Sequence, residues 1–379
     1  MPPATPVRTP PYLVDVAANL TDCVFRGVDW NGKRLHDDDF DCVLARAQEC
    51  NVHQIMITGT SLAQCVKAIA LCRRYPNRQL LCTVGVHPAH CGEFLRPLDL
   101  HEVQRVAAND TSSVTARYEK PAATTTAVQE EAWAQERLDY LVNLVKENRD
   151  VVVAVGEIGL DYAELTCCPR EVQETYFVRQ LIAFAPLQLP FLFHSRGCGM
   201  SFVGHLKDTW AQLSSQATTT RLVDSKMHSA SSLPNAQLCG VVHSFNGTLE
   251  EQEALLSMGL YLSVNGSAFR EASLAAQVTS IPVDRLMFET DAPWCDIRPN
   301  DYGAQFVRTT FTTTKRRRPF EMGACLERRN EPCHLVQVME AYLGCAKASA
   351  TGVGDPLSSL NAATLTDRVY ANCRRLFNL

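Results

Sequence analysis

Four residues of types that bind divalent metals occur far apart in the chain, and each follows a short apolar run. They are Glu157, His194, His243 and Asp291, after the runs VVVAVG, PFLF, CGVV and DRLMFET. Two carboxylates with two imidazoles suit Zn²⁺ or Mn²⁺, whereas Mg²⁺ prefers oxygen ligands and retains waters. A bound ion would lower the pKa of a coordinated water and polarise an ester or phosphoryl oxygen. Asp291 is the candidate both for ligation and for accepting the proton of that water.

Taken singly, each of these residues has an ordinary structural explanation. A lone histidine is more often a hydrogen-bonded core residue than a ligand, and Glu157 alone could cap a helix or pair with a cation. Their repetition after four apolar runs favours the metal site. Gly156 and Gly159 flank Glu157, and we expect them to let the backbone turn sharply where the strand ends.

The apolar runs predict eight strands, most of them separated by helical segments, and therefore a single (β/α)₈ TIM barrel. Such a barrel opens the carboxyl ends of all its strands on one face, which would bring the four residues together. A doubly wound sheet is the alternative, but no glycine-rich phosphate fingerprint follows the first strand. The predicted strands cover residues 12–16, 54–58, 80–85, 151 onward, 190–194, 239–243, 260–264 and 284–289.

Other polar and aromatic residues at these strand ends are candidates for contacts with a substrate. His87 could act on a substrate or its leaving group, or simply form a turn with Pro88. Arg196 could fork onto a phosphate or make a surface salt bridge. Trp294 could stack on a base or pack at the rim of the barrel. Asp161 is placed to orient a metal ligand.

The remaining sequence predicts one domain with irregular additions. Residues 1–11 are rich in proline and read as a disordered leader before a domain at 12–379, and residues 109–130 and 214–236 read as low-complexity surface insertions. No run of about 18 apolar residues predicts a membrane span. The N-terminus has no apolar signal core, so we expect a cytoplasmic protein, with the nucleus possible.

Charge and cysteine content add two expectations. The net charge of −5 argues against a general polyanion binder, yet a basic region at Lys315–Arg318 and Arg328–Arg329 could attract a nucleic-acid backbone or be only a solvated face. The 16 cysteines include no CxxC pair, so they suggest apolar filler, not a thiolate zinc site. His334 reads as a polar residue at a helix start and not as a ligand.

The chain resembles the TatD-like deoxyribonucleases, and within them the eukaryotic branch. The matching motifs are NLTD, MITGT, TVGVHP, CGEF, VGEIGLDY, FHSR, VVHSFNGT, ETDAPWC, RRNEPCHL and NCRRLF, from residue 19 to residue 377. The resemblance implies a TIM-barrel nuclease that uses one or two divalent ions, Mg²⁺ first and Mn²⁺ or Zn²⁺ as alternatives. It implies that Glu157, His194, His243 and Asp291 ligate the metal and that Glu157 bridges where two ions bind.

One departure from the family pattern concerns the second ion. Many members carry an HxH pair after the first strand, and here those positions hold Ala17 and Asn19, with Asp15 kept. Asn19 offers only a neutral amide oxygen, toward substrate or a weakly held second ion. The expected function is hydrolysis of DNA, single-stranded or at duplex ends, as a 3′→5′ exonuclease or endonuclease by a monomer. The alternative is a metallohydrolase of the same fold acting on a small phosphoester or amide.

Overall fold

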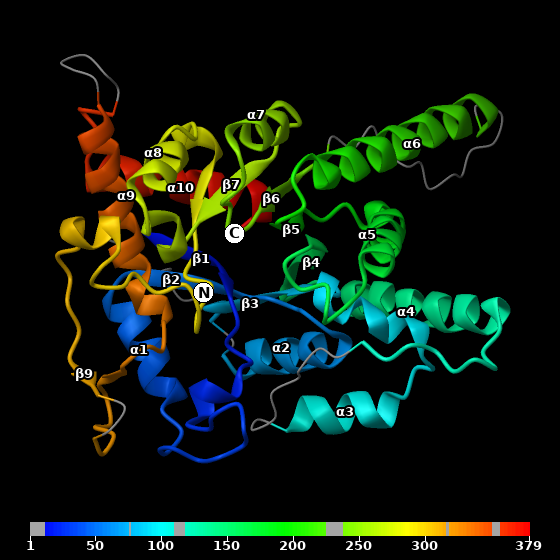
Figure 1. Ribbon diagram of the computed structural model, residues 1–379, viewed down its shortest axis with the longest axis horizontal. Helices are drawn as coiled ribbons and strands as arrows, with labels where there is room; N and C mark the ends of the chain where they lie inside the picture. The colour runs from blue at the N-terminus through cyan, green and yellow to red at the C-terminus, as the bar shows by residue number, and fades with distance from the viewer. Residues whose placement is uncertain (1–11, 76, 110–117, 225–237, 316–317, 351–356) are drawn as a thin grey trace, which may run out of the picture. The chain divides into compact units, whose positions relative to one another are not determined.

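The computed structural model describes residues 12–75, 77–109, 118–224, 238–315, 318–350 and 357–379 (Figure 1). Within them, eight parallel strands alternate with helices and follow one another in chain order, from β1 to β8, around a nearly closed barrel. The predicted TIM barrel is confirmed, and the doubly wound alternative is wrong. The leader predicted at residues 1–11 lies outside the described residues.

The chain divides into two compact parts, which we call the central part, Ile57–Leu262, and the terminal part, which combines the residues up to Met56 with Ser263–Leu379. The central part contains β3, β4, β5, β6 and the first half of β7. Its elements are α2 (Leu62–Arg74), β3 (Leu80–Val84), α3 (Leu100–Ala108), α4 (Ala127–Glu147), β4 (Val152–Asp161), α5 (Arg170–Phe184), β5 (Phe191–Arg196), α6 (Met200–Asp224), β6 (Gly240–Val242), α7 (Leu249–Ser257) and β7 (Tyr261–Val264).

The terminal part contains the first and last strands of the barrel. Its elements are β1 (Leu13–Ala18), α1 (Phe40–Glu49), β2 (Val52–Ile57), α8 (Ala272–Thr279), β8 (Leu286–Phe288), α9 (Leu335–Ser349) and α10 (Ala362–Phe377), with a short parallel pair of β9 (Thr313–Thr314) and β10 (Cys325–Leu326). The backbone N–H of Asp291 donates to the carbonyl of Ala17 at 2.9 Å, so the segment after β8 lies against β1.

Strand β4 differs from its prediction, because it continues through Glu157 to Asp161 and does not turn there. Gly156 and Gly159 have φ of +145° and +153°, and a Cβ at these positions would collide with the carbonyl oxygens of Leu192 and His194 in β5. The glycines therefore allow β4 to lie close to β5. The register between the two strands is irregular between Val155 and Ile158, around Glu157.

The two predicted insertions are partly helical. Helix α4 begins at Ala127, where Thr126 and Gln129 form a reciprocal capping box, so residues 127–130 belong to a helix. Helix α6 continues to Asp224, so residues 214–224 of the second predicted insertion are helical, and the insertion itself stays a prediction. The segments 110–117 and 225–237 lie outside the described residues. No helix in the described part of the chain has the length and apolar character needed to cross a membrane.

Candidate metal centre

Three histidine rings of the central part converge on one carboxylate oxygen. Glu157 Oε1 lies 2.7 Å from His194 Nδ1, 2.7 Å from His243 Nε2 and 3.5 Å from His87 Nε2. His194 Nδ1 and His243 Nε2 are 3.0 Å apart, and Glu157 and His243 are buried. The structure therefore brings together Glu157, His194, His243 and His87, as the sequence predicted for the residues of this part.

Asp161 forms a hydrogen bond with His194 at Nε2, the ring nitrogen that does not face Glu157. Its Oδ2 lies 3.1 Å from His194 Nε2, while its Oδ1 accepts from Arg196 Nε at 3.0 Å. A hydrogen bond to one ring nitrogen sets the tautomer and the direction of the other. His194 Nδ1 therefore faces Glu157 and His243, as expected from the predicted orienting role of Asp161.

Two buried glutamines of α5 fix the backbone on either side of this cluster. Gln173 accepts from Asp161 N at 2.8 Å and donates to Asp161 O at 2.9 Å. Gln180 binds Val86 in the same way, at 2.8 and 3.0 Å, next to His87. Neither glutamine was predicted from the sequence. Their spacing of seven residues on an otherwise apolar face is the signal that could have revealed them.

The ionisation of the cluster follows from the convergence of imidazoles on a buried carboxylate. Burial raises the pKa of Glu157, but its electrostatic interactions with the imidazoles of His243 and His87 and the hydrogen bonds from His194 and His243 lower it to well below its usual range. Burial lowers the pKa of His194, but its hydrogen bonds with Asp161 and Glu157 raise it above its usual range. Burial lowers the pKa of His87 to about 3, which keeps this ring neutral.

These atoms form a donor set that fits a divalent ion. Ligand atoms bound at about 2 Å to one ion lie roughly 3 Å apart, which is the spacing found here. The nitrogens of His87 and His194 and a carboxylate oxygen of Glu157 all lie within 4.8 Å of one another. Imidazole with carboxylate is a common donor set for Zn²⁺ or Mn²⁺. His90, three residues after His87, was not predicted; burial lowers its pKa to about 4.

Arg196 forms salt bridges with two carboxylates. Besides Asp161, it reaches Glu164, with Nη2 to Oε1 at 2.8 Å, and its side chain is 42% exposed. The salt-bridge alternative is therefore the one found. A phosphate contact from Arg196 stays a prediction, and it requires the exposed Glu164 to be displaced.

Asp291, in the terminal part, is held from both sides. Asn19 Nδ2 donates to its Oδ1 at 3.0 Å and Cys295 Sγ lies 3.3 Å from its Oδ2. Its own backbone has a φ of +52°, and Thr290 before it is anchored by hydrogen bonds to the buried Asp15 at 2.8 and 2.5 Å. Burial raises the pKa of Asp15 to about 8. Asn19, predicted to contact substrate, thus positions Asp291.

Trp294 lies in a cavity of about 910 Å³ in the terminal part. Its ring stacks on that of Trp30, with centroids 4.9 Å apart and planes 13° apart, and both residues are 44% exposed. Trp294 is therefore neither buried at a barrel rim nor isolated, and the pair presents an accessible aromatic surface.

The predicted basic region does not form a single surface. Arg329 is buried and binds Asp39 and Glu331, so it is not available to a nucleic-acid backbone. That part of the prediction is wrong, because the charges of Arg329 are satisfied inside the protein. Arg328 is exposed, and residues 316–317 lie outside the described residues.

Replacing Asp161 with asparagine is expected to weaken metal binding by about 10–100-fold, because the amide no longer fixes the tautomer of His194. Titration with Mn²⁺, followed by electron paramagnetic resonance, measures the affinity. Asp150→Asn is the matched control, since Asp150 is exposed and pairs only weakly with Arg73 at 3.4 Å. Equal affinities for Asp161→Asn and the wild type would exclude the orienting role.

Comparison with known proteins gives consistent results. The family model for TatD related DNase matches residues 14–378. Deoxyribonuclease Tat-D of Schizosaccharomyces pombe is 33% identical over 328 residues, covering 86% of each chain. The 3′-5′ ssDNA/RNA exonuclease TatD of Edwardsiella piscicida is 28% identical, covering 86% of this chain and 89% of its own. A crystal structure of an uncharacterized amidohydrolase from Saccharomyces cerevisiae has a TM-score of 0.74 at 26% identity, covering 97% of this chain and all of that one.

Proposed function

Because the chain belongs to the TatD-related DNase family and is a hydrolase of ester bonds, we propose that it is a divalent-metal-dependent deoxyribonuclease that shortens DNA from the 3′ end. The observation that supports this most is the convergence of three imidazoles on the buried Glu157 carboxylate. The relatives named 3′-5′ ssDNA/RNA exonucleases support the polarity and single-stranded substrates. Endonuclease cleavage is the alternative within the same chemistry.

In this proposal Glu157, His194 and His243 hold the ion, and His87 contacts the substrate or its leaving group. A bound divalent ion would supply a water of lowered pKa and a polarised phosphoryl oxygen. Asp291 is assigned as a fourth ligand and as the proton acceptor, because it follows the eighth strand. We expect Asp291→Asn to abolish turnover. Trp294 would stack on a base.

We propose Mg²⁺ as the working ion, with Mn²⁺ and Zn²⁺ as alternatives, and one tightly held ion at the Glu157 cluster. Ala17 carries no ligand atom, and the Asn19 amide already donates to Asp291. A second ion would then bind weakly, or only together with a substrate phosphate. The Mn²⁺ titration described for Asp161→Asn counts the ions: two tight sites without substrate, both weakened by Asp161→Asn, would refute this assignment.

Metal affinity is expected to rise with pH by about tenfold per unit until His194 loses its proton, because a bound ion displaces that proton. Because the pKa of His194 is raised, the pH range over which the affinity rises extends above the ordinary value of 6.5. In the metal-free protein, Glu157 and His194 change the stability in opposite directions as the pH rises. The lowered pKa of Glu157 contributes stability above 4.5, and the raised pKa of His194 contributes stability below 6.5. Calorimetry in buffers of different ionisation enthalpy measures the released proton, and a pH-independent affinity would contradict the proposal.

Competition between substrate classes tests the function directly. We expect a single-stranded oligonucleotide to be hydrolysed with a higher kcat/KM than bis-p-nitrophenyl phosphate or p-nitrophenyl phosphate, and no hydrolysis of an anilide. A preference for the small esters or the anilide would favour the alternative metallohydrolase of the same fold.

A further inference from the structure

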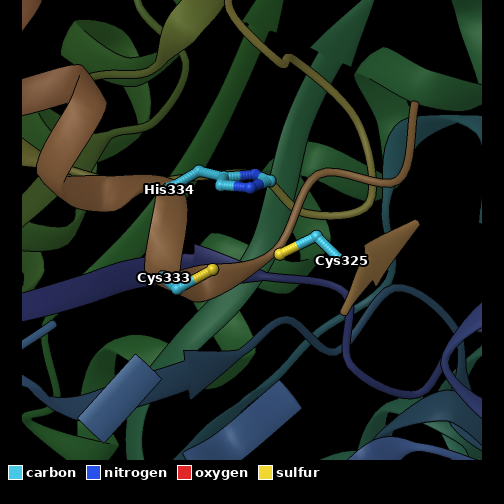
Figure 2. A group of neighbouring side chains, drawn as sticks. All are labelled: Cys325, Cys333 and His334. Atoms are coloured by element: carbon cyan, nitrogen blue, oxygen red, sulfur yellow. The ribbon is translucent and has the colours of Figure 1, made fainter. Parts of the chain in front are cut away.

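A second group of metal-binding side chains lies in the terminal part of the chain. Cys325, Cys333 and His334 each offer one ligand atom, and these atoms all lie within 4.8 Å of one another. Figure 2 shows both sulfur atoms turned toward each other, with the imidazole ring beside them. The sequence suggested apolar filler for the cysteines and no ligand role for His334, because no CxxC pair marks a site whose ligands are eight residues apart.

The ligands come from two segments with hydrogen-bonded backbones. Cys325 begins β10, where it pairs with Thr313 of β9 and its N–H donates to the carbonyl of Thr312 at 2.9 Å. Cys333 and His334 end a 3₁₀ turn, Pro332–His334, that leads into α9. Both cysteines are buried and His334 is half-buried. The positions of the ligand atoms are therefore set by the backbone.

Asn330 orients the His334 ring for ligation. The Asn330 amide Nδ2 donates to two backbone carbonyls, of Thr290 at 2.8 Å and of Trp294 at 2.6 Å. Its Oδ1 is then the atom that lies 2.9 Å from His334 Nδ1, and the backbone N–H of Glu331 lies 3.1 Å from that Oδ1 and 3.2 Å from Nδ1. In a metal-binding ring the Nδ1 proton would be donated to Oδ1, which also accepts the Glu331 N–H. This tautomer leaves the lone pair on Nε2. A protonated Nδ1 bonded to an oxygen outside the site is the usual arrangement of a metal-binding histidine.

Two of the three side chains border one cavity. Cys325 and His334 line the cavity of about 910 Å³ that also contains Trp30 and Trp294. An ion could enter by this route, and a fourth position would face the cavity.

We propose that Cys325, Cys333 and His334 bind one Zn²⁺ ion whose fourth position opens to this cavity. Two sulfurs and one imidazole nitrogen are a donor set typical of tetrahedral Zn²⁺, in contrast to the oxygen-and-nitrogen set around Glu157. A chain with both sites would hold two ions with different chemistry. This inference does not depend on the proposed nuclease activity.

Cobalt substitution of the full-length, fully reduced protein tests the site. Binding of Co²⁺ by thiolates gives a sulfur-to-metal charge-transfer band, which a site of histidines and carboxylates does not produce. We expect one equivalent of Co²⁺ to give this band and Zn²⁺ to remove it. Cys325→Ser should weaken the affinity by at least about 100-fold, because losing a ligand costs more than losing an outer partner of one.

Two controls separate the site from the rest of the chain. Cys345→Ser makes the same change at a buried cysteine of α9 and should leave the band intact. Glu157→Gln should also leave it intact, whether or not the chain is a nuclease. Should Cys325→Ser fail to fold, protection of two wild-type thiols from alkylation by Zn²⁺ gives the same test. A reduced wild-type protein without the band, or with no thiol protected, would overturn the proposal, as would an undiminished band in Cys325→Ser.

Discussion

Replacing Glu157 with glutamine is expected to lower DNA hydrolysis by about 10³-fold or more, because the lost metal supplies several kcal/mol of transition-state stabilisation. Glu157 Oε1 is the atom on which His194, His243 and His87 converge. A neutral amide at this position has the same shape but gives up the negative charge that a divalent ion requires. Steady-state kinetics with a single-stranded oligonucleotide measures the loss, and kcat should fall more than KM rises.

The matched control for this change is Glu164→Gln. Glu164 is also in the central part and its side chain is 45% exposed, where it binds Arg196 at 2.8 Å. We expect its substitution to change kcat by less than about tenfold, since exposed ion pairs contribute little. Far-ultraviolet circular dichroism should show the same folded protein for both variants. Wild-type activity in Glu157→Gln would remove the carboxylate from the mechanism.

Replacing Arg329 with methionine is expected to destabilise the protein by about 3–5 kcal/mol, because it leaves buried carboxylates without their partner. Arg329 binds Asp39 Oδ1 at 2.8 Å and Oδ2 at 2.5 Å, and also Glu331 Oε1 at 2.9 Å. Arg46 binds the other oxygen of Glu331 at 2.7 Å. Burial lowers the pKa of Arg329, but these carboxylates raise it above its ordinary value, so the charge is kept.

Arg328→Met is the comparison that isolates burial, since the neighbouring Arg328 is exposed. We expect this variant to change the free energy of unfolding by less than about 0.5 kcal/mol. Urea denaturation of both variants gives the two values. A loss at Arg329 as small as that expected at Arg328 would show that the buried ion pairs do not stabilise this region.

The sequence predicted those features that repeat along the chain. Alternating strands and helices gave the barrel, and polar residues after the apolar runs gave Glu157, His194 and His243 as neighbours. The length of β4 was missed, because Gly156 and Gly159 suggested a turn. Their actual role is to let β5 approach, and a contact between two strands leaves no local pattern in the sequence.

Features that depend on distant partners were not predictable in the same way. Arg329 read as part of a basic run, but its partner Asp39 lies 290 residues away in the chain. Gln173 and Gln180 read as polar positions of a helix until the backbone groups that they bind are known. Cys325 and Cys333 meet only because a strand and a 3₁₀ turn bring them together. In each case the tertiary contact, not the local sequence, decides the role.

Cleavage of a 5′-labelled single-stranded oligonucleotide tests the central proposal most directly. Metal-free protein would be compared with protein given Mg²⁺, Mn²⁺ or Zn²⁺, with Glu157→Gln beside each. We predict a metal-dependent ladder that shortens from the 3′ end and is absent in the variant. A ladder that forms without metal, or that persists in Glu157→Gln, would contradict metal-dependent hydrolysis at this cluster, and no cleavage with any of the three ions would contradict the nuclease function.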